Sequence, residues 1–306
     1  MASPRPDELV AAIDGVSGGP YPGRRAAHAK GSFYEGSFTA SPQARELSRA
    51  AHLAGPEVPV TVRFSNGTGN PNLPDNERTD GRGMAAKFRV PDGPEVDSVT
   101  ISIPVFFVNT PEAFLAFTRA RKPDPETGQP DMEKLGAVIA ERPEIGEALQ
   151  LILPTLTPPV SYATCAYNSL HAFGLVNADD ERTWARLRWR PEAGEHVLPE
   201  EEIEGQGHDY LQEDLQTRLD REPVRFHLDA ILAADGDPLD DPTQPWPDER
   251  EVVELGTLEL TRVVELDEPV VFDPNNLADG IEPSDDAILA ARSPAYSVSI
   301  ERRTAG

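Results

Sequence analysis

Alternation of apolar and polar positions predicts a chain built largely from β-strands. Residues 31–39 (GSFYEGSFT) alternate with a period of two, which is typical of a strand with one buried face. Further segments are rich in β-branched and aromatic residues and bounded by Gly, Pro or Asn, so they also predict strands. These segments are 58–66, 83–90, 97–108, 170–177, 182–190, 223–233 and 250–266, of which 170–177 and 182–190 predict a hairpin.

Helix start signals lie between these strands. Ser41 supplies a capping hydroxyl, Pro42 occupies the first helical position, and Gly55 ends the pattern, so residues 41–55 predict one helix. The same criteria predict helices over 110–121, over 131–153 with a break at Pro143, and over 209–221.

The segment 282–303 (EPSDDAILAARSPAYSVSIERR) predicts a further helix, with Ser284 as its N-cap. Pro294 should end or bend that helix, because the residue before a proline, Ser293, avoids helical geometry.

Together these elements predict a fold of the α+β class, an antiparallel β-barrel with inserted helices. We expect about seven to nine strands. Residues 1–20 are rich in Pro and Gly and predict a flexible N-terminal arm, while residues 21–306 predict a single domain. A long polar loop over 67–83 interrupts the strands, and loops of that length in compact domains are often functional.

The net charge narrows the classes of partner. The chain carries 53 acidic and 28 basic residues, a net charge of −25, which disfavours binding to nucleic-acid phosphates. The chain contains no run of about 18 apolar residues, so we expect no membrane-spanning helix. The first residues lack a basic segment followed by an apolar one, so we expect no secretory signal. We therefore expect a cytoplasmic location.

Cysteine and histidine usage argues against several kinds of site. Cys165 is the single cysteine of the chain, so no intramolecular disulfide framework and no multi-cysteine metal site can form. The histidines do not have the spacing of a helix-borne zinc site; they stand at positions 28, 52, 171, 196, 208 and 227.

Five short motifs, taken in order, resemble those of the haem-catalase family. They are residues 25–31 (RAAHAKG), 63–65 (RFS) followed by 80–83 (DGRG), 104–114 (PVFFVNTPEAF), 171–177 (HAFGLVN) and 292–296 (RSPAY). The resemblance covers about residues 20–178 and 266–303. It implies a catalase-like barrel that binds haem b and lacks the wrapping and C-terminal helical domains of full catalases, as the small catalase-related peroxidases do.

The resemblance also implies roles for single residues. Tyr296 would be the iron ligand, and it must bind as a phenolate although free tyrosine has a pKa near ~10. A guanidinium favours that charged form, and Arg292 lies four residues before it. His171 and Asp286 would complete a supporting charge network.

On the other side of the haem, His28 would be the catalytic base that moves a proton between the two peroxide oxygens. Ser65 would hold its imidazole in place. Phe114 would pack on the haem face. Three arginines would bind the haem propionates, because guanidinium groups pair well with carboxylates; they are Arg25, Arg63 and Arg303.

Three departures from the family pattern change the expected activity. An asparagine that positions hydrogen peroxide as a reductant is replaced by Ile101, or by Ser102 if the alignment slips by one residue. Ala27 replaces the valine that precedes the distal histidine, which widens the approach to the iron. Pro294 lies before Tyr296, whereas family members carry a proline after the tyrosine.

These features favour a haem-dependent peroxidase that reduces hydrogen peroxide or organic hydroperoxides with a small organic reductant and has weak catalase activity. Two alternatives remain open at this point: a catalase-fold enzyme that rearranges lipid hydroperoxides, as allene oxide synthases do, and a non-catalytic haem-binding protein. The sequence leaves the electron donor and the assembly open, a homodimer included.

Overall fold

Nine strands and nine α-helices are present in the part of the chain that the computed structural model describes, residues 3–266 and 270–304. The strands are β1 (Gly31–Ala40), β2 (Val58–Asn66), β3 (Arg82–Arg89), β4 (Glu95–Ile101), β5 (Tyr167–Val176), β6 (Arg182–Pro191), β7 (Val224–Leu232), β8 (Val252–Val264) and β9 (Ile281–Pro283). The helices are α1 (Pro6–Ser17), α2 (Ala44–Leu47), α3 (Ala51–Ala54), α4 (Pro111–Ala120), α5 (Met132–Glu141), α6 (Pro143–Ile152), α7 (Glu200–Ile203), α8 (Tyr210–Leu219) and α9 (Ala287–Thr304), with short 3₁₀ turns η1 (Leu153–Thr155) and η2 (Tyr162–Thr164).

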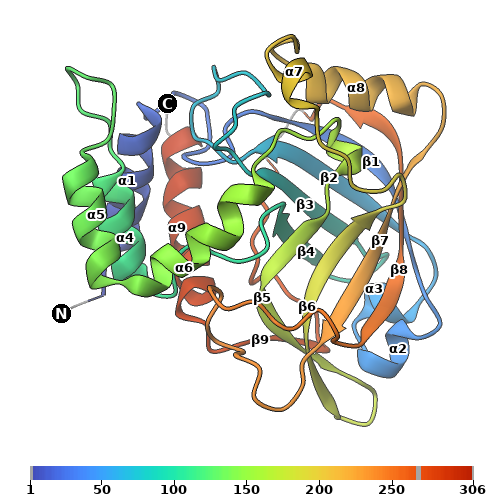
Figure 1. The fold of residues 1–306 in the computed structure, drawn as a ribbon. Helices are drawn as coiled ribbons and strands as arrows, with labels where there is room; N and C mark the ends of the chain where they lie inside the picture. The colour runs from blue at the N-terminus through green and yellow to red at the C-terminus, as the bar shows by residue number, and fades with distance from the viewer. Residues whose placement is uncertain (1–2, 267–269, 305–306) are drawn as a thin grey trace.

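Strands β1 to β8 close an antiparallel barrel. The sheet runs β4-β3-β2-β1-β8-β7-β6-β5, and a pairing of β4 with β5 at Ile101 and Asn168 joins its two ends (Figure 1). Strand β9 adds to the free side of β5 through Phe173, Gly174 and Leu175. The predicted α+β class and antiparallel barrel are confirmed.

Aromatic side chains fill the inside of the barrel. Tyr34 packs edge-on against Phe64 at a centroid distance of 5.5 Å, and Phe38 packs against Trp189 at 6.0 Å. All four are fully buried. A small cavity of about 30 Å³ lies among side chains that include His52, Phe88 and Leu255. The interior is therefore a packed core.

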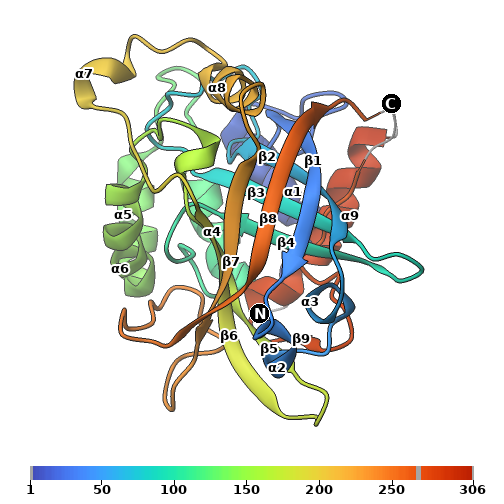
Figure 2. The ribbon, with the colours of Figure 1, turned by 90° about the vertical axis from the view of Figure 1, so that its right-hand side faces the viewer.

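The two sides of the barrel differ in what covers them. Every residue of β2 after Pro59 is buried, so both faces of this strand are covered. In the middle of β8, residues 256–260 alternate between buried and partly exposed positions, as a strand with one solvated face does. Helices α1, α4, α5, α6 and α9 gather on one side (Figure 1), while β7, β8 and β1 face the viewer in Figure 2 without a helix over their middle.

Helix α1 differs from the flexible arm that the sequence predicts over residues 1–20. Residues 6–17 form a helix that buries Leu9 and Val10, and Asp14 pairs with Arg302 of α9 at 2.8 Å. The reason is tertiary: the helix packs against α4 and α9, which are distant in sequence. Residues 1–2 of the predicted arm lie outside the described residues.

Most predicted helices and strands are confirmed, but two segments were wrong in extent. Residues 41–55 form two short helices, because Ser48 is extended and its hydroxyl donates to the Gly280 carbonyl at 2.7 Å. The strand predicted over 97–108 ends at Ile101. Beyond it, Phe106 donates its backbone N–H to the Pro242 carbonyl, which draws the chain away from the sheet.

The predicted cap of the last helix was wrong, and so was its predicted end at Pro294. Asp286, not Ser284, caps α9, since its Oδ1 accepts from the backbone N–H groups of Ile288 and Leu289. Pro294 lies inside α9 and does not end it, although an internal proline costs a helix roughly 3 kcal/mol. No helix of the described residues is long and apolar enough to cross a membrane.

His52 should make the stability of the barrel depend on pH. Its ring is 3% exposed, stacks 4.5 Å from the Phe88 ring and has no partner for Nδ1 among the described residues. Burial lowers the pKa of His52 from 6.5 to about 4. The stability that neutral His52 contributes is therefore complete above pH 6.5 and is lost as the pH falls towards 4.

We expect His52→Phe to reduce this loss. Between about pH 7 and about pH 5, the unfolding free energy of the haem-free wild type should fall by about 2 kcal/mol more than that of the variant. Urea unfolding of both proteins at the two pH values measures the difference. His196→Gln, which changes an exposed histidine, is the control and should behave as the wild type. Equal pH dependence of wild type and His52→Phe would contradict the assignment.

Candidate active site

One row of residues crosses the outer face of the barrel from β1 to β4. Gly31 pairs with Ser65, Ser65 with Gly83, and Gly83 with Ile101. Directly paired residues of antiparallel strands point to the same face of the sheet. The four positions therefore share one face, and it is the face opposite to buried Phe64, which points into the core.

The imidazole of His28 lies over the middle of this row. Its Nδ1 is 3.0 Å from Ser65 Oγ. A Cβ atom on Gly83 would lie 2.7 Å from Cε1 and Nδ1 of the ring and 2.8 Å from Ser65 Oγ. Real Cβ contacts are never this close, so only glycine at position 83 leaves room for the ring in this place.

The backbone around His28 is held in an uncommon conformation. His28 has φ 56°, in the left-handed region that non-glycine residues rarely adopt. Its N–H donates to Gly67 O at 3.1 Å, and its carbonyl accepts from Arg63 Nη2 at 2.9 Å. The next residue, Ala29, donates to Thr68 O at 3.0 Å. These bonds come from β2 and the long polar loop, which together fix the histidine.

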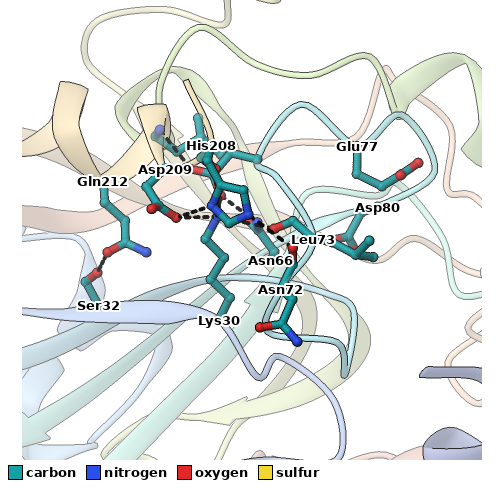
Figure 3. A network of polar contacts seen from close by, with 12 residues as sticks. Lys30, Ser32, Asn66, Asn72, Leu73, Glu77, Asp80, His208, Asp209 and Gln212 are labelled. Atoms are coloured by element: carbon teal, nitrogen blue, oxygen red, sulfur yellow. Dashed lines mark hydrogen bonds and ion pairs between the residues drawn. The ribbon is translucent and has the colours of Figure 1, made fainter. Parts of the chain in front are cut away.

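Lys30 supports the same segment through two ion pairs, one of them buried; Figure 3 shows Lys30 beside Asp209. Lys30 Nζ lies 2.7 Å from Asp75 Oδ1 and 2.6 Å from Asp209 Oδ1. Asp75 is fully buried, and its carboxylate also accepts from Asn66 Nδ2 at 2.8 Å and from Leu211 N at 3.0 Å. The pair thus joins the start of β1, the loop after β2 and the start of α8, two residues away from His28.

His28 is neutral at neutral pH in this structure. Burial, followed by the positive charges of Arg63, Arg292 and Arg25, lowers its pKa from 6.5 to about 3. A neutral imidazole whose Nδ1 is bonded to Ser65 keeps Nε2 for proton exchange. The arrangement can therefore accept a proton from a bound molecule and return it.

Three guanidinium groups gather beside this face. Arg25 and Arg303 both donate from Nη2 to the Val270 carbonyl, at 2.8 and 3.3 Å. Burial and the neighbouring charges of Arg63 and Arg303 lower the pKa of Arg25 to about 9, and burial lowers the pKa of Arg63 to about 10. None of the three is paired with a carboxylate of the described residues, and Arg303 Nε has no partner there. Among residues 3–266 and 270–304, this group of cations has no carboxylate partner.

Helix α9 presents a tyrosine and an arginine that contact each other. Arg292 Nη2 donates to Tyr296 Oη at 2.6 Å, and the guanidinium carbon lies 5.4 Å from the centroid of the tyrosine ring. Both side chains are half-buried. The charge of Arg292 helps to lower the pKa of His28, and Tyr296 opposes the lowering of the Arg25 pKa, so this part of α9 lies near both groups.

His171 and Asp286 form a buried pair at the start of α9. His171 Nδ1 lies 2.5 Å from Asp286 Oδ2, and each side chain is 1% exposed. Burial lowers the pKa of His171, and the bond to Asp286 opposes that shift. Because Asp286 also caps α9, the pair fixes the first turn of the helix that carries Arg292.

An apolar wall continues from the row on the barrel to α4. Ile101, Phe106 and Phe107 pack against the same buried apolar cluster. The two rings lie 6.3 and 5.7 Å from the Phe114 ring, centroid to centroid. Ser102 points elsewhere: its Oγ accepts from the backbone N–H of Arg82 at 2.9 Å. Of the two residues considered for the missing amide, Ile101 is the one that shares a face with Ser65.

The structure therefore brings the predicted site residues together in pairs and small groups. Several supporting residues were missed as contributors by the sequence reasoning, and they are Lys30, Asp75 and Gly83. Lys30 and Gly83 lie inside the motifs 25–31 and 80–83, and that position could have indicated that they contribute to the site. Asp75 lies in a loop of many polar residues and has no distinguishing local pattern.

Comparisons with known proteins agree with this arrangement. A family model described as Catalase matches residues 22–306. The Catalase-related peroxidase of Synechococcus elongatus is 36% identical, with 98% of this chain and 89% of that protein covered. The one from Mycolicibacterium paratuberculosis is 39% identical, with 98% and 95% covered.

Full-length catalases are also similar, over part of their length. The Catalase of Pseudomonas aeruginosa is 33% identical, with 89% of this chain and 56% of that protein covered. The crystal structure of a fungal catalase superposes with a TM-score of 0.82 at 24% identity and covers 92% of this chain and 60% of that one. The structural likeness establishes a shared fold.

Gly83→Ala tests the packing of the candidate site directly. The added methyl should displace the His28 ring and break its bond to Ser65, because it would lie inside van der Waals distance of both. We expect the ring nitrogen resonances of His28 in ¹H–¹⁵N spectra to shift while the far-UV circular dichroism stays the same. Gly136→Ala is the matched control, since no atom lies within 4 Å of a Cβ there. Unchanged His28 resonances in Gly83→Ala would contradict this geometry.

Proposed function

The chain belongs to the catalase family, and from that premise we propose that it is a haem-dependent peroxidase with weak catalase activity. Family membership makes it an oxidoreductase that acts on peroxide. The observation that carries the finer proposal is the row on the barrel face. His28 contacts Ser65 of this row and Ile101 shares its face, which supports His28 as the base and an apolar side chain in place of a second polar group.

The residues around the space between barrel and α9 fit a haem b. The cluster of Arg25, Arg63 and Arg303, which has no carboxylate partner among the described residues, would bind the two propionates. Tyr296 would be the iron ligand, because the Arg292 guanidinium bonded to its oxygen supplies the positive charge that a phenolate needs. When bound, the haem iron would supply the redox chemistry of peroxide cleavage.

His28 would carry the proton transfer of the reaction. Its neutral Nε2 would take the proton from one peroxide oxygen, which breaks an O–H bond and forms an N–H bond. The same proton would then go to the other oxygen, which leaves as water when the O–O bond breaks. Ser65 would hold the His28 ring during both transfers. The buried Lys30–Asp75 pair would hold the start of β1, the strand that follows His28.

Ile101 would set the balance between two reductants. A second hydrogen peroxide acting as reductant needs a polar group to hold it, and an isoleucine side chain offers no donor or acceptor. The wall formed by Ile101, Phe106 and Phe107 favours less polar molecules instead. Ala27 is half-buried beside His28 and leaves more room than a valine would. A small organic reductant is therefore the favoured electron donor; a homodimer and a cytoplasmic location stay predictions.

Tyr296→Phe tests the assigned iron ligand. The variant should lose most of its haem, because phenylalanine offers no oxygen to the iron while the barrel and α9 stay folded. Haem content per chain, from the absorbance ratio of the purified protein, measures this. Tyr21→Phe, which removes a hydroxyl bonded only to the Ser17 carbonyl among the described residues, should keep wild-type content. A full haem complement with an unchanged spectrum in Tyr296→Phe would show the ligand assignment to be wrong.

The split between donor oxidation and oxygen release tests the function. The wild type should oxidise small phenols readily and release oxygen from hydrogen peroxide slowly. His28→Ala should slow peroxide activation by about 10²–10⁴, the usual contribution of a positioned acid–base group. Ile101→Asn should raise oxygen release relative to donor oxidation, because an amide can hold the second peroxide.

Steady-state rates with a phenolic donor and an oxygen electrode measure the two activities side by side. His196→Ala, at an exposed histidine, is the control for His28→Ala and should leave both rates unchanged. The proposal fails if the wild type releases oxygen as its main reaction, or if His28→Ala oxidises donors at the wild-type rate.

A further inference from the structure

A hydrogen-bonded cluster of three side chains lies beside the proline of α9. Ser293 Oγ donates to Asp273 Oδ1 at 2.6 Å. Asn275 Nδ2 donates to Ser293 Oγ at 2.8 Å and to the Leu289 carbonyl at 2.9 Å. We name these three residues the Ser293 clamp. They belong to two segments, since Asp273 and Asn275 precede β9 whereas Ser293 lies within α9.

The clamp acts at the place where Pro294 weakens the helix. A proline has no N–H for the carbonyl four residues earlier, and it disfavours helical geometry at the residue before it. Here that preceding residue is Ser293, whose regular helical bond would join its N–H to the Leu289 carbonyl. Asn275 bonds to that same carbonyl and to the Ser293 side chain, so it bridges the two ends of the weakened turn.

The clamp is itself anchored to the barrel. The backbone N–H of Asp273 donates to Asp97 Oδ2 at 3.0 Å, and Asp97 Oδ1 lies 2.7 Å from Lys87 Nζ. Asp97 and Lys87 are buried residues of β4 and β3. The weakened turn of α9 is therefore tied, through two hydrogen bonds and a buried ion pair, to the rigid sheet.

Arg292 and Tyr296 lie on opposite sides of the proline. Their hydrogen bond of 2.6 Å joins positions i and i+4, which lie one above the other only if the helix is regular between them. A kink at Pro294 would change that separation. The contact between Arg292 and Tyr296 thus depends on the helix being continuous through the proline.

We propose that the Ser293 clamp keeps α9 helical through Pro294 and so positions Tyr296 against Arg292. Asp273, Asn275 and Ser293 are then positioning residues for the iron ligand. The inference rests on the proposed function for the role of Tyr296, but not for the effect on the helix. It explains how a chain with a proline before the ligand tyrosine can keep the arginine–tyrosine contact.

A double-mutant cycle with Pro294→Ala tests the proposal, because the clamp should matter only while the proline is present. Four proteins are compared: wild type, Ser293→Ala, Pro294→Ala and the double variant. In the haem-free proteins, hydrogen exchange of the α9 backbone amides reads the helix itself. In the haem-loaded proteins, the rate of haem loss to excess apomyoglobin and the absorption spectrum of the ferric iron read the position of the ligand.

We expect Ser293→Ala to speed both amide exchange around Ser293 and haem loss by about tenfold, the effect of losing one to two hydrogen bonds. In the Pro294→Ala background the same substitution should change either rate by less than about twofold. Ser293→Thr, which keeps the hydroxyl, should behave as the wild type. Thr217→Ala removes an exposed hydroxyl that donates to the carbonyl four residues earlier in α8, Glu213, and is the matched control.

The outcomes are separable. Equal effects of Ser293→Ala in both backgrounds would mean that Ser293 is a general structural residue, and no effect in either would mean that the clamp holds nothing; each overturns the proposal. If Ser293→Ala does not fold, Asn275→Ala removes the same bridge from the other side and is read in the same cycle. A wild type that binds no haem would defeat the proposed function, while the exchange cycle would still decide on the clamp.

Discussion

The packed interior of the barrel is the constraint from which the rest of the structure follows. Because Tyr34, Phe38, Phe64 and Trp189 fill the inside, a cofactor-sized ligand has room only outside the sheet. The outer face of β2 is buried as well, which requires helices over it. The candidate site is formed in this way between a sheet that supplies a rigid register of side chains and helices that supply the opposite wall.

The sequence predicted the barrel because strand periodicity survives wherever one face is solvated, as in β1 and β8, and because caps such as Thr110 act locally. It failed where tertiary contacts override local preference. Residues 41–55 divide because Ser48 bonds to Gly280, and residues 6–17 become a helix because α4 and α9 cover them. The predicted end at Pro294 was wrong, and the groups that contact this turn, Asp273 and Asn275, are distant from it in sequence.

The candidate site divides in the same way. Motif resemblance named His28, Ser65, Arg292 and Tyr296, and the structure places these in two contacting pairs, although their chemical roles remain a proposal. It did not name Asp75, whose importance lies in its partners rather than in its neighbours along the chain. The local sequence also gives no sign that the three arginines form a cluster. They are far apart in the chain and come together only because α9 lies beside the start of β1.

The contact of α1 with α9 has a consequence for how the protein is made. These helices pack together, yet 269 residues lie between the end of α1 at Ser17 and the start of α9 at Ala287. At the usual pace of translation, α1 leaves the ribosome roughly 15–50 s before its partner exists. Arg25 is likewise synthesised long before Arg303, the arginine that shares its Val270 contact. These segments thus meet only after α9 has been synthesised, so a cofactor bound between them would report that both have folded.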